Sequence, residues 1–116
     1  MNIVVLRGVL SRPPVTRELP SGDVLVTYEV AVRPSEGERA ESVPVSWFEA
    51  PAAASELAVD EEVVVCGRVR RRFFRAGGAT QSRVEVVATA VVPTRHAKRA
   101  QRLVREACGG AEEAVG

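Results

Sequence analysis

Arginines recur at every second position in the second half of the segment Glu62 to Phe74, which reads EVVVCGRVRRRFF. In a β-strand, alternate side chains point to the same side, so one face of this segment carries several guanidinium groups and ends on an aromatic ring. Guanidinium groups neutralise phosphates, and an aromatic ring offers a surface on which a base can stack. The spacing therefore indicates a face suited to nucleic acid. A solvated edge strand kept soluble by its arginines is the alternative interpretation. The predicted face consists of Cys66, Arg68, Arg70, Arg72 and Phe74.

The distribution of charge along the chain supports the first interpretation. The formal net charge of the 116 residues is only +1, which by itself says nothing about partners. Between Val63 and Cys108, however, the sequence has eleven arginine or lysine residues and only two carboxylates, Glu85 and Glu106. Such an asymmetry predicts a basic face on an otherwise neutral protein. Nearly all of this charge is arginine, the side chain best suited to bidentate phosphate contacts and to stacking.

Residue patterns for other chemistry are missing from the sequence. The two cysteines, Cys66 and Cys108, do not have the spacing of metal ligands, and His96 has no second ligand nearby. No serine lies in a nucleophile motif, and no glycine-rich loop for phosphates or dinucleotides is present. We therefore predict a protein that is not an enzyme, with no cofactor and no metal. We also predict no membrane association, because no apolar run approaches the length of a membrane span and no signal segment opens the chain.

The candidate face needs a sheet to hold it, and six segments have the composition of strands. They are rich in β-branched residues and are bounded by turn residues. We predict strands at Asn2–Leu10, Val15–Leu19, Val24–Val32, Glu41–Glu49, Glu62–Phe74 and Gln81–Val92, and a short helix at Pro51–Leu57.

Individual residues within these segments predict local features of the sheet. Gly67 lies in mid-strand, where a missing side chain permits a bulge or a sharp bend. Pro44 lacks an amide hydrogen, so its strand should be an edge or locally irregular. Trp47 shares its face with valines, so we expect it in the core. We expect the loop Arg33–Ala40 to be exposed and the tip Arg75–Thr80 to be flexible.

The order of these elements predicts an all-β fold. Three strand units, a short helix and two further strands are the order of an OB-fold, a five-stranded Greek-key barrel whose helix lies between strands 3 and 4 and closes one end. This domain should cover residues 1–93. Residues 94–116 should form a separate basic tail, with a helix over Arg95–Ala107 and disorder from Gly109 to Gly116. The helix is interpreted either as a nucleic-acid arm or as a solvated tail.

The opening NIVVLRGVLSRPPVTRELPSGDVLVTYEVAV resembles the first strands of the bacterial single-stranded DNA-binding protein family. Further matches follow in the family's order, and together they cover about residues 2 to 93. They include Ala54-Ser55-Glu56-Leu57, Gly67-Arg68-Val69 with Phe74, and Glu85-Val86-Val87. The resemblance implies sequence-tolerant binding of single-stranded DNA, at the nucleoid in the cytoplasm, in replication, repair or recombination.

The resemblance also assigns site residues. Phe48 and Phe74 fall on two of the family's base-stacking positions, and Phe74 replaces a tryptophan. Ser42 stands where another stacking tryptophan is expected, so we interpret the chain as a divergent or accessory paralogue. On this interpretation bases lie across Phe48 and Phe74, and phosphates are held by Arg68, Arg70, Arg72, Arg75 and Arg83.

The family's assembly suggests further partners. Its members commonly form tetramers through their first strands, so we expect a homo-oligomer and favour a tetramer over a dimer. The acidic, phenylalanine-ended tip that recruits replication and repair partners is not recognisable, so we do not expect such recruitment. The alternative function is a structural OB-fold subunit that assembles with itself or with a paralogue and binds nucleic acid weakly or not at all.

Overall fold

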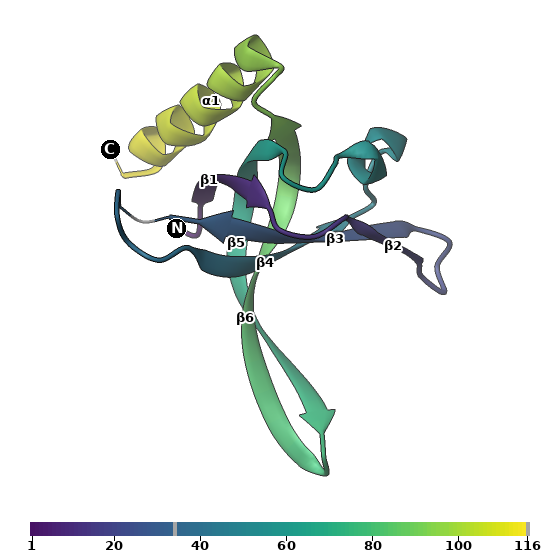
Figure 1. The fold of residues 1–116 in the computed structure, drawn as a ribbon. Coiled ribbons are helices and arrows are strands. Elements are labelled where there is room, and N and C mark those ends of the chain that lie inside the picture. The colour runs from purple at the N-terminus through teal and green to yellow at the C-terminus, as the bar shows by residue number, and fades with distance from the viewer. Residues whose placement is uncertain (34, 116) are drawn as a thin grey trace.

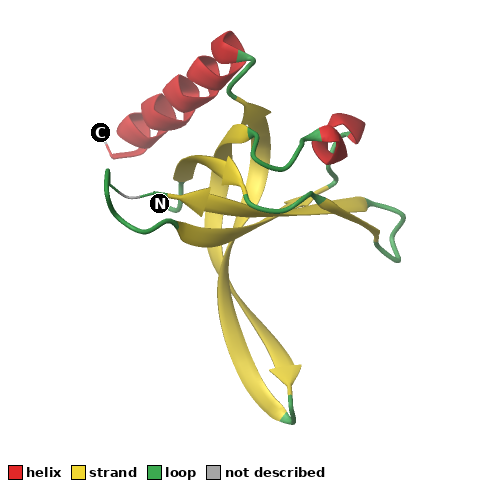
Figure 2. Ribbon diagram, viewed as in Figure 1, coloured by secondary structure: helices red, strands yellow, loops and turns green. Residues whose placement is uncertain are grey.

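The computed structural model describes residues 1–33 and 35–115, with side chains described as far as residue 107. Six strands and a short helix are followed by a longer helix that lies against one side of the sheet (Figures 1 and 2). In chain order the elements are β1 Val4–Leu10, β2 Val15–Glu18, β3 Val24–Val32, β4 Glu41–Phe48, η1 Ala52–Glu56, β5 Glu62–Ala76, β6 Ala79–Pro93 and α1 Ala97–Val115.

The strands form one sheet in the order β1-β5-β6-β4-β3-β2, and β1 also pairs with β3. The pairings therefore return to the strand at which they start, and β2 is added beside β3. All strand pairs are antiparallel except β4–β6, which is parallel and covers two residue pairs, Val45–Val86 and Ser46–Val87. This mostly-β architecture agrees with the predicted OB-fold.

Alternation along the strands builds a core of valines. Leu10, Val30, Val63 and Val65 are fully buried, and side chains from every strand except β2 join them. Tyr28 is 2% exposed, and its hydroxyl donates a hydrogen bond to the carbonyl oxygen of Ala54 at 2.7 Å, which ties η1 to the sheet. Burial raises the pKa of the Tyr28 hydroxyl far above its usual range. Trp47 packs against this core, as predicted.

Gly67 marks a bulge in the pairing of β5 and β6. The register of the pair shifts between Cys66 and Gly67, and Thr89 on β6 is the extra residue. A Cβ atom on Gly67 would lie 2.1 Å from the carbonyl oxygen of Val87, so no other residue fits here without movement of the backbone. The predicted bulge is confirmed. From Arg70 and Glu85 onward, β5 and β6 continue as a two-stranded ribbon that projects from the sheet (Figure 1).

The tip of this ribbon is more regular than the sequence suggested. We expected a flexible tip over Arg75–Thr80, but the strands stay paired as far as Ala76 and Ala79. The two residues between them, Gly77 and Gly78, have φ angles of 60° and 80°. A two-residue turn with positive φ at both positions follows the twist of the strands, so the ladder continues to the turn.

The helix α1 covers the beginning of β5 and the end of β6, away from the turn of the ribbon. Ala100 is buried with Val64 and Val92, and Leu103 and Val5 pack against them. The helix begins at Ala97, two residues later than predicted, and it extends to Val115 rather than ending at Ala107. The expected disorder of residues 109–116 therefore falls partly within this helix, despite the low helix propensity of Gly109 and Gly110, and Gly116 lies outside the described residues.

An ion pair, Arg95–Glu61, and a hydrogen bond from Thr94 to Glu62 fix the segment just before α1. Glu61 accepts a hydrogen bond from the Arg95 guanidinium, and Glu62 accepts one from Arg7 and one from the Thr94 hydroxyl at 2.9 Å each. The hydrogen bond from the Ala58 amide, aided by Arg95, lowers the pKa of Glu61, and the bonds from Arg7 and Thr94 lower that of Glu62. In the described part of the chain, no helix has the length and apolar character needed to cross a bilayer.

Other predicted boundaries differ from the structure by a few residues. The strand predicted from Asn2 begins at Val4, and the short helix is a five-residue 3₁₀ helix that starts after Pro51 rather than including it. Pro51 is extended, as its missing amide hydrogen allows just before a helix. Of the two outcomes predicted for Pro44, an edge or an irregularity, the structure shows the edge: β4 pairs with β3 through Pro44 without interruption, whereas it pairs with β6 only at Val45 and Ser46.

Candidate nucleic-acid interface

The predicted face of β5 continues across the neighbouring strands. Arg72 pairs with Arg83 across the ribbon, and Phe74 pairs with Gln81, so these side chains share one side of the ribbon. Phe74 remains 38% exposed. Together with Arg72 and Arg83, its ring lines a surface depression of about 430 Å³ between the ribbon and strands β2, β3 and β4.

The other residues that line this depression come from strands β2, β3, β4 and β6 and from the turn before β2. Thr27 and Glu29 of β3 and Pro44 and Ser46 of β4 line it beside Glu85 of β6. Arg12, Pro13 and Val15 contribute from the turn between β1 and β2 and from β2 itself. The depression thus has an aromatic ring at one side and arginines at both, which suits a base and its flanking phosphates.

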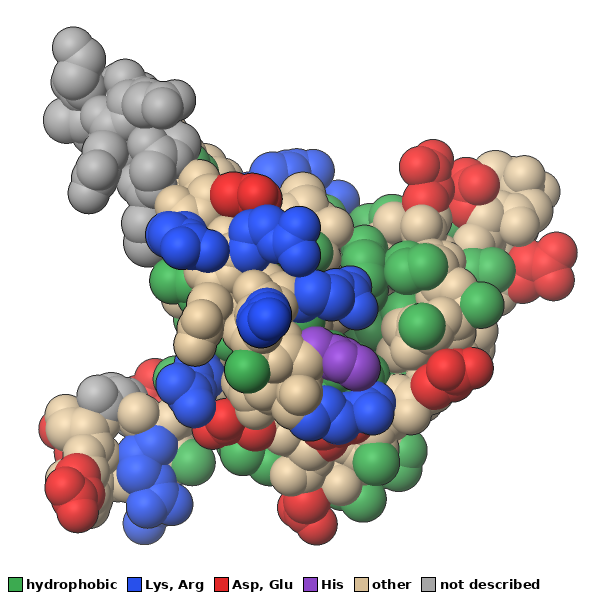
Figure 3. Space-filling view, turned by 90° about the horizontal axis from the view of Figure 1, so that it is seen from above, with side chains coloured by type: hydrophobic (Ala, Val, Ile, Leu, Met, Phe, Trp, Pro, Cys, Tyr) green, Lys and Arg blue, Asp and Glu red, His purple; other side chains and the backbone are tan. Residues whose placement is uncertain are grey.

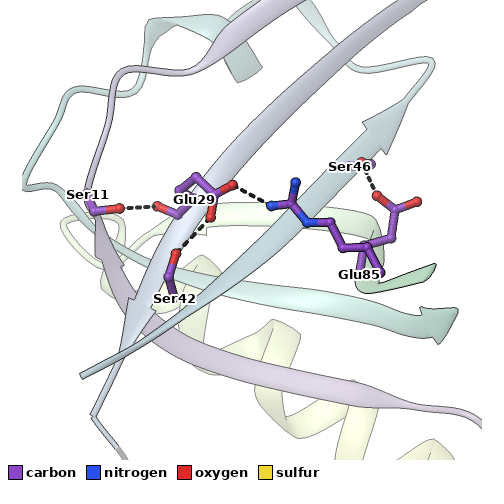
Figure 4. Close-up of polar contacts among 6 residues, drawn as sticks. Ser11, Glu29, Ser42, Ser46 and Glu85 are labelled. Atoms are coloured by element: carbon purple, nitrogen blue, oxygen red, sulfur yellow. Dashed lines mark hydrogen bonds and ion pairs between the residues drawn. The ribbon is translucent and has the colours of Figure 1, made fainter. Parts of the chain in front are cut away.

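A buried carboxylate lies at the centre of this surface. Glu85 is 5% exposed, and its Oε2 atom accepts a hydrogen bond from the Ser46 hydroxyl at 2.9 Å (Figure 4). Its Oε1 atom accepts two more, from Nε and Nη2 of Arg70 at 2.9 and 2.8 Å. A buried carboxylate needs this many partners, because an unpaired charge in that position would be strongly destabilising.

A second carboxylate holds Arg83 in the same way. Glu29 accepts a hydrogen bond from Nη2 of Arg83 at 2.8 Å and one from the Ser42 hydroxyl at 2.7 Å (Figure 4). Arg72 and Arg83 are neighbours across the ribbon with like charge, and Glu29 offsets their repulsion. Ser42, which occupies a position where the family resemblance implies a stacking tryptophan, thus has a polar role here.

Phe48 lies apart from the depression, under Arg70. The ring is 36% exposed, and the guanidinium carbon of Arg70 is 5.2 Å from its centroid, within the range of a cation–π contact. Because Glu85 holds Arg70 by two hydrogen bonds, the guanidinium is fixed beside one side of the Phe48 ring. A base stacking on Phe48 therefore uses the remaining exposed surface or displaces Arg70.

The seven predicted site residues fall into three groups. Phe74, Arg72 and Arg83 line the depression, and Arg70 and Phe48 form the neighbouring pair described above. Arg68 is exposed on the same side of β5, between the depression and α1, and makes no ion pair with any described residue. Arg75 lies on the opposite side of the ribbon and donates a hydrogen bond to the carbonyl oxygen of Gly78 at 3.3 Å.

Sequence reasoning missed several residues of this surface. Arg12 follows a strand end and precedes two prolines, so its position depends on how the turn folds back over β3. Glu29 and Glu85 are each the only carboxylate in their strand. A single carboxylate inside an apolar strand indicates an ion partner, but only the order of strands in the sheet shows which arginine that partner is.

No three His, Cys, Asp or Glu side chains gather as a metal site requires within the part of the chain that the structure describes. A comparison with family models matches residues 1–94 to the single-strand binding protein family. A comparison with curated proteins gave no match. The matched residues include every strand and η1 and stop before α1.

Proposed function

Because the chain belongs to the single-strand binding protein family, we propose that it binds single-stranded DNA across the face that carries Phe74, Phe48 and three arginines of β5, Arg68, Arg70 and Arg72. The observation that carries this proposal is the depression, where an exposed ring lies beside Arg72 and Arg83 and opposite Arg12. The family comprises DNA-binding proteins rather than enzymes. A role in replication, repair or recombination at the nucleoid is part of the same proposal.

The contacts divide the arginines by role. Arg12, Arg68 and Arg72 form no ion pair within the described structure, so we assign them to phosphates. Arg70 and Arg83 are held by Glu85 and Glu29, so they reach phosphates only in exchange for these carboxylates. Arg75 supports the turn of the ribbon and meets a strand that passes around the tip. Neither stacking nor phosphate contact depends on base identity, so binding is sequence-tolerant.

The finer description of the fold and assembly belongs to the same proposal. The ring of pairings β1-β5-β6-β4-β3-β1 supports a five-stranded Greek-key OB barrel closed at one end by η1. We also propose a homo-oligomer, a tetramer rather than a dimer. Its support is β1, which pairs with β3 only at Val9 and Leu10, so its edge from Val4 to Gly8 is open to a second copy.

Two adjacent phenylalanines provide the experiment. Phe74 lines the depression, whereas Phe73 points to the other side of the ribbon and is 67% exposed. Both rings are substantially exposed, so alanine at either position should leave the fold intact. Stacking contributes about 1–3 kcal/mol per base, so Phe74→Ala should weaken binding of oligo(dT) by about 5- to 150-fold. Phe73→Ala should change the affinity less than about twofold, measured by fluorescence anisotropy at low salt.

The outcome separates the two candidate functions. Equal losses for Phe73→Ala and Phe74→Ala would contradict the assigned face, because the two rings share the ribbon but not its side. If the unsubstituted protein does not bind oligo(dT) even at low salt, the face is not a binding site, and the alternative of a structural subunit is correct.

A further inference from the structure

A group of four cations with no ion pair among the described residues lies outside the proposed site, on α1. Looking down on this helix, Figure 3 shows lysine and arginine side chains gathered along it. All of them are exposed, and none forms an ion pair with a described residue. On the sheet, in contrast, two of the five arginines assigned from the sequence are held by carboxylates. The cations of α1 are Lys98, Arg99, Arg102 and Arg105.

These cations are unfavourable for the helix that carries them. Lys98 and Arg99 lie in the first turn, where the helix dipole favours acidic residues, and the first turn has none. Lys98 and Arg102 are four residues apart, and Arg102 and Arg105 are three apart, so like charges are neighbours on one side of the helix. The contact of α1 with Val64 and Val92 does not require them. A charge pattern that opposes local stability points to an external partner.

Strand β5 connects this helix to the proposed site. Alternate positions of β5 on the outer side run from Phe74 through Arg72, Arg70 and Arg68 to Val64, the residue that α1 covers. The ten residue steps from Val64 to Phe74 correspond to about 33 Å along a strand. Arg68 lies between the two ends, exposed and without an ion pair among the described residues. The two basic surfaces are thus the ends of one track.

We propose that α1 is a second phosphate-binding surface, which holds the sugar–phosphate backbone of a single strand after it leaves the sheet and passes Arg68. The proposal rests on the proposed function, because it takes the strand on the sheet as its starting point. Rings are missing from the described part of α1, so its contribution is electrostatic and independent of base identity. The strand must be longer than the part that the sheet occupies.

Strand length separates the two surfaces in an experiment. An OB-fold covers about 4–16 nucleotides, so oligo(dT) of about 6 nucleotides tests the sheet and one of about 30 nucleotides reaches α1. The variant Lys98→Gln/Arg102→Gln/Arg105→Gln should bind the short strand within about twofold of the unsubstituted protein. It should bind the long strand at least tenfold more weakly at low salt. For the long strand, the slope of log K against log salt concentration should be shallower by about 2, because the variant loses three phosphate contacts and each contributes about 0.7.

A matched variant controls for net charge. Arg33→Gln/Arg39→Gln/Arg71→Gln removes the same charge at exposed positions outside both surfaces, with Arg71 on the side of the ribbon opposite to Phe74, and it should bind the long strand as the unsubstituted protein does. Equal losses for both triple variants, or an unchanged affinity of the α1 variant for the long strand, would overturn the proposal. Both results leave the short-strand binding in place, so they differ from a failure of the proposed function, in which the short strand does not bind at all.

Discussion

Replacing Glu85 should strengthen the salt dependence of DNA binding while weakening the fold. Glu85→Gln keeps the shape of the side chain and an oxygen that can accept from Ser46, but it removes the negative charge that holds Arg70. Arg70 is about one-third exposed, so its guanidinium can turn outward to a phosphate once released. The substitution thus converts an internal ion pair into a contact with the ligand.

The expected magnitudes follow from these contacts. Losing a charge-assisted, two-fold hydrogen bond at a partly exposed arginine should lower the free energy of unfolding by about 1–3 kcal/mol. One additional phosphate contact should steepen the slope of log K against log salt by about 0.7. Between 50 and 200 mM salt, the affinity of the variant should therefore fall about 2.6-fold more than that of the unsubstituted protein.

The assay is a salt titration with oligo(dT) of about 6 nucleotides, combined with urea unfolding. Glu56→Gln adds the same net charge at an exposed position on η1 and should leave the slope unchanged. The double variant Glu85→Gln/Arg70→Gln should return the slope to its original value, because the released cation is then missing. A Glu85→Gln slope equal to that of the unsubstituted protein would refute the role given to this ion pair.

Two further predictions concern the bulge at Gly67 and the attachment of α1. Gly67→Ala places a Cβ atom 2.1 Å from the Val87 carbonyl oxygen, so it should lower the melting temperature by at least several degrees. Gly22→Ala is the control: its Cβ meets no atom within 4 Å, so it tests the cost of a positive φ alone. The pKa of Glu62 is lowered in the folded state, so its stabilising effect is present at neutral pH and is lost as pH falls through that lowered value. Between pH 7 and pH 3, Glu62→Gln should therefore lose less thermal stability than the unsubstituted protein, and an equal loss would contradict the assignment.

The strands and their faces could be predicted from the sequence because period-two alternation and turn residues are local signals. The stretch of β5 from Cys66 to Phe74 shows this. Arg68, Arg70, Arg72 and Phe74 share a side because β5 itself has no extra residue, and the bulge lies at Thr89 on β6. The turn at Gly77 and Gly78 is equally local, although its regularity was underestimated. Such features depend on neighbours in the sequence.

Which arginines are free could not be predicted, because that depends on contacts between distant strands. Arg83 and Glu29 are 54 positions apart, and Ser46 and Glu85 are 39 apart. Composition treats all these arginines alike, and only the order of strands in the sheet brings particular carboxylates to them. The attachment of α1 to Val64 and Val92 has the same origin, since its thin apolar side gives no indication of where it packs.

Separating paired from unpaired cations gives the two surfaces different binding physics. Guanidinium groups held by Glu29 and Glu85 release few counterions when DNA binds. Binding to the sheet therefore depends on stacking at Phe74 and on phosphate contacts of Arg12, Arg68 and Arg72, which give log K against log salt concentration a slope of about 2 in magnitude. The cations of α1 are unpaired within the described structure, and phosphate contacts by three of them add about 2 to the magnitude of this slope. Raising the salt concentration therefore weakens the helix contacts first and leaves the ring-bearing face occupied. The length of strand that the protein holds then depends on ionic strength, while the position at which stacking anchors it does not.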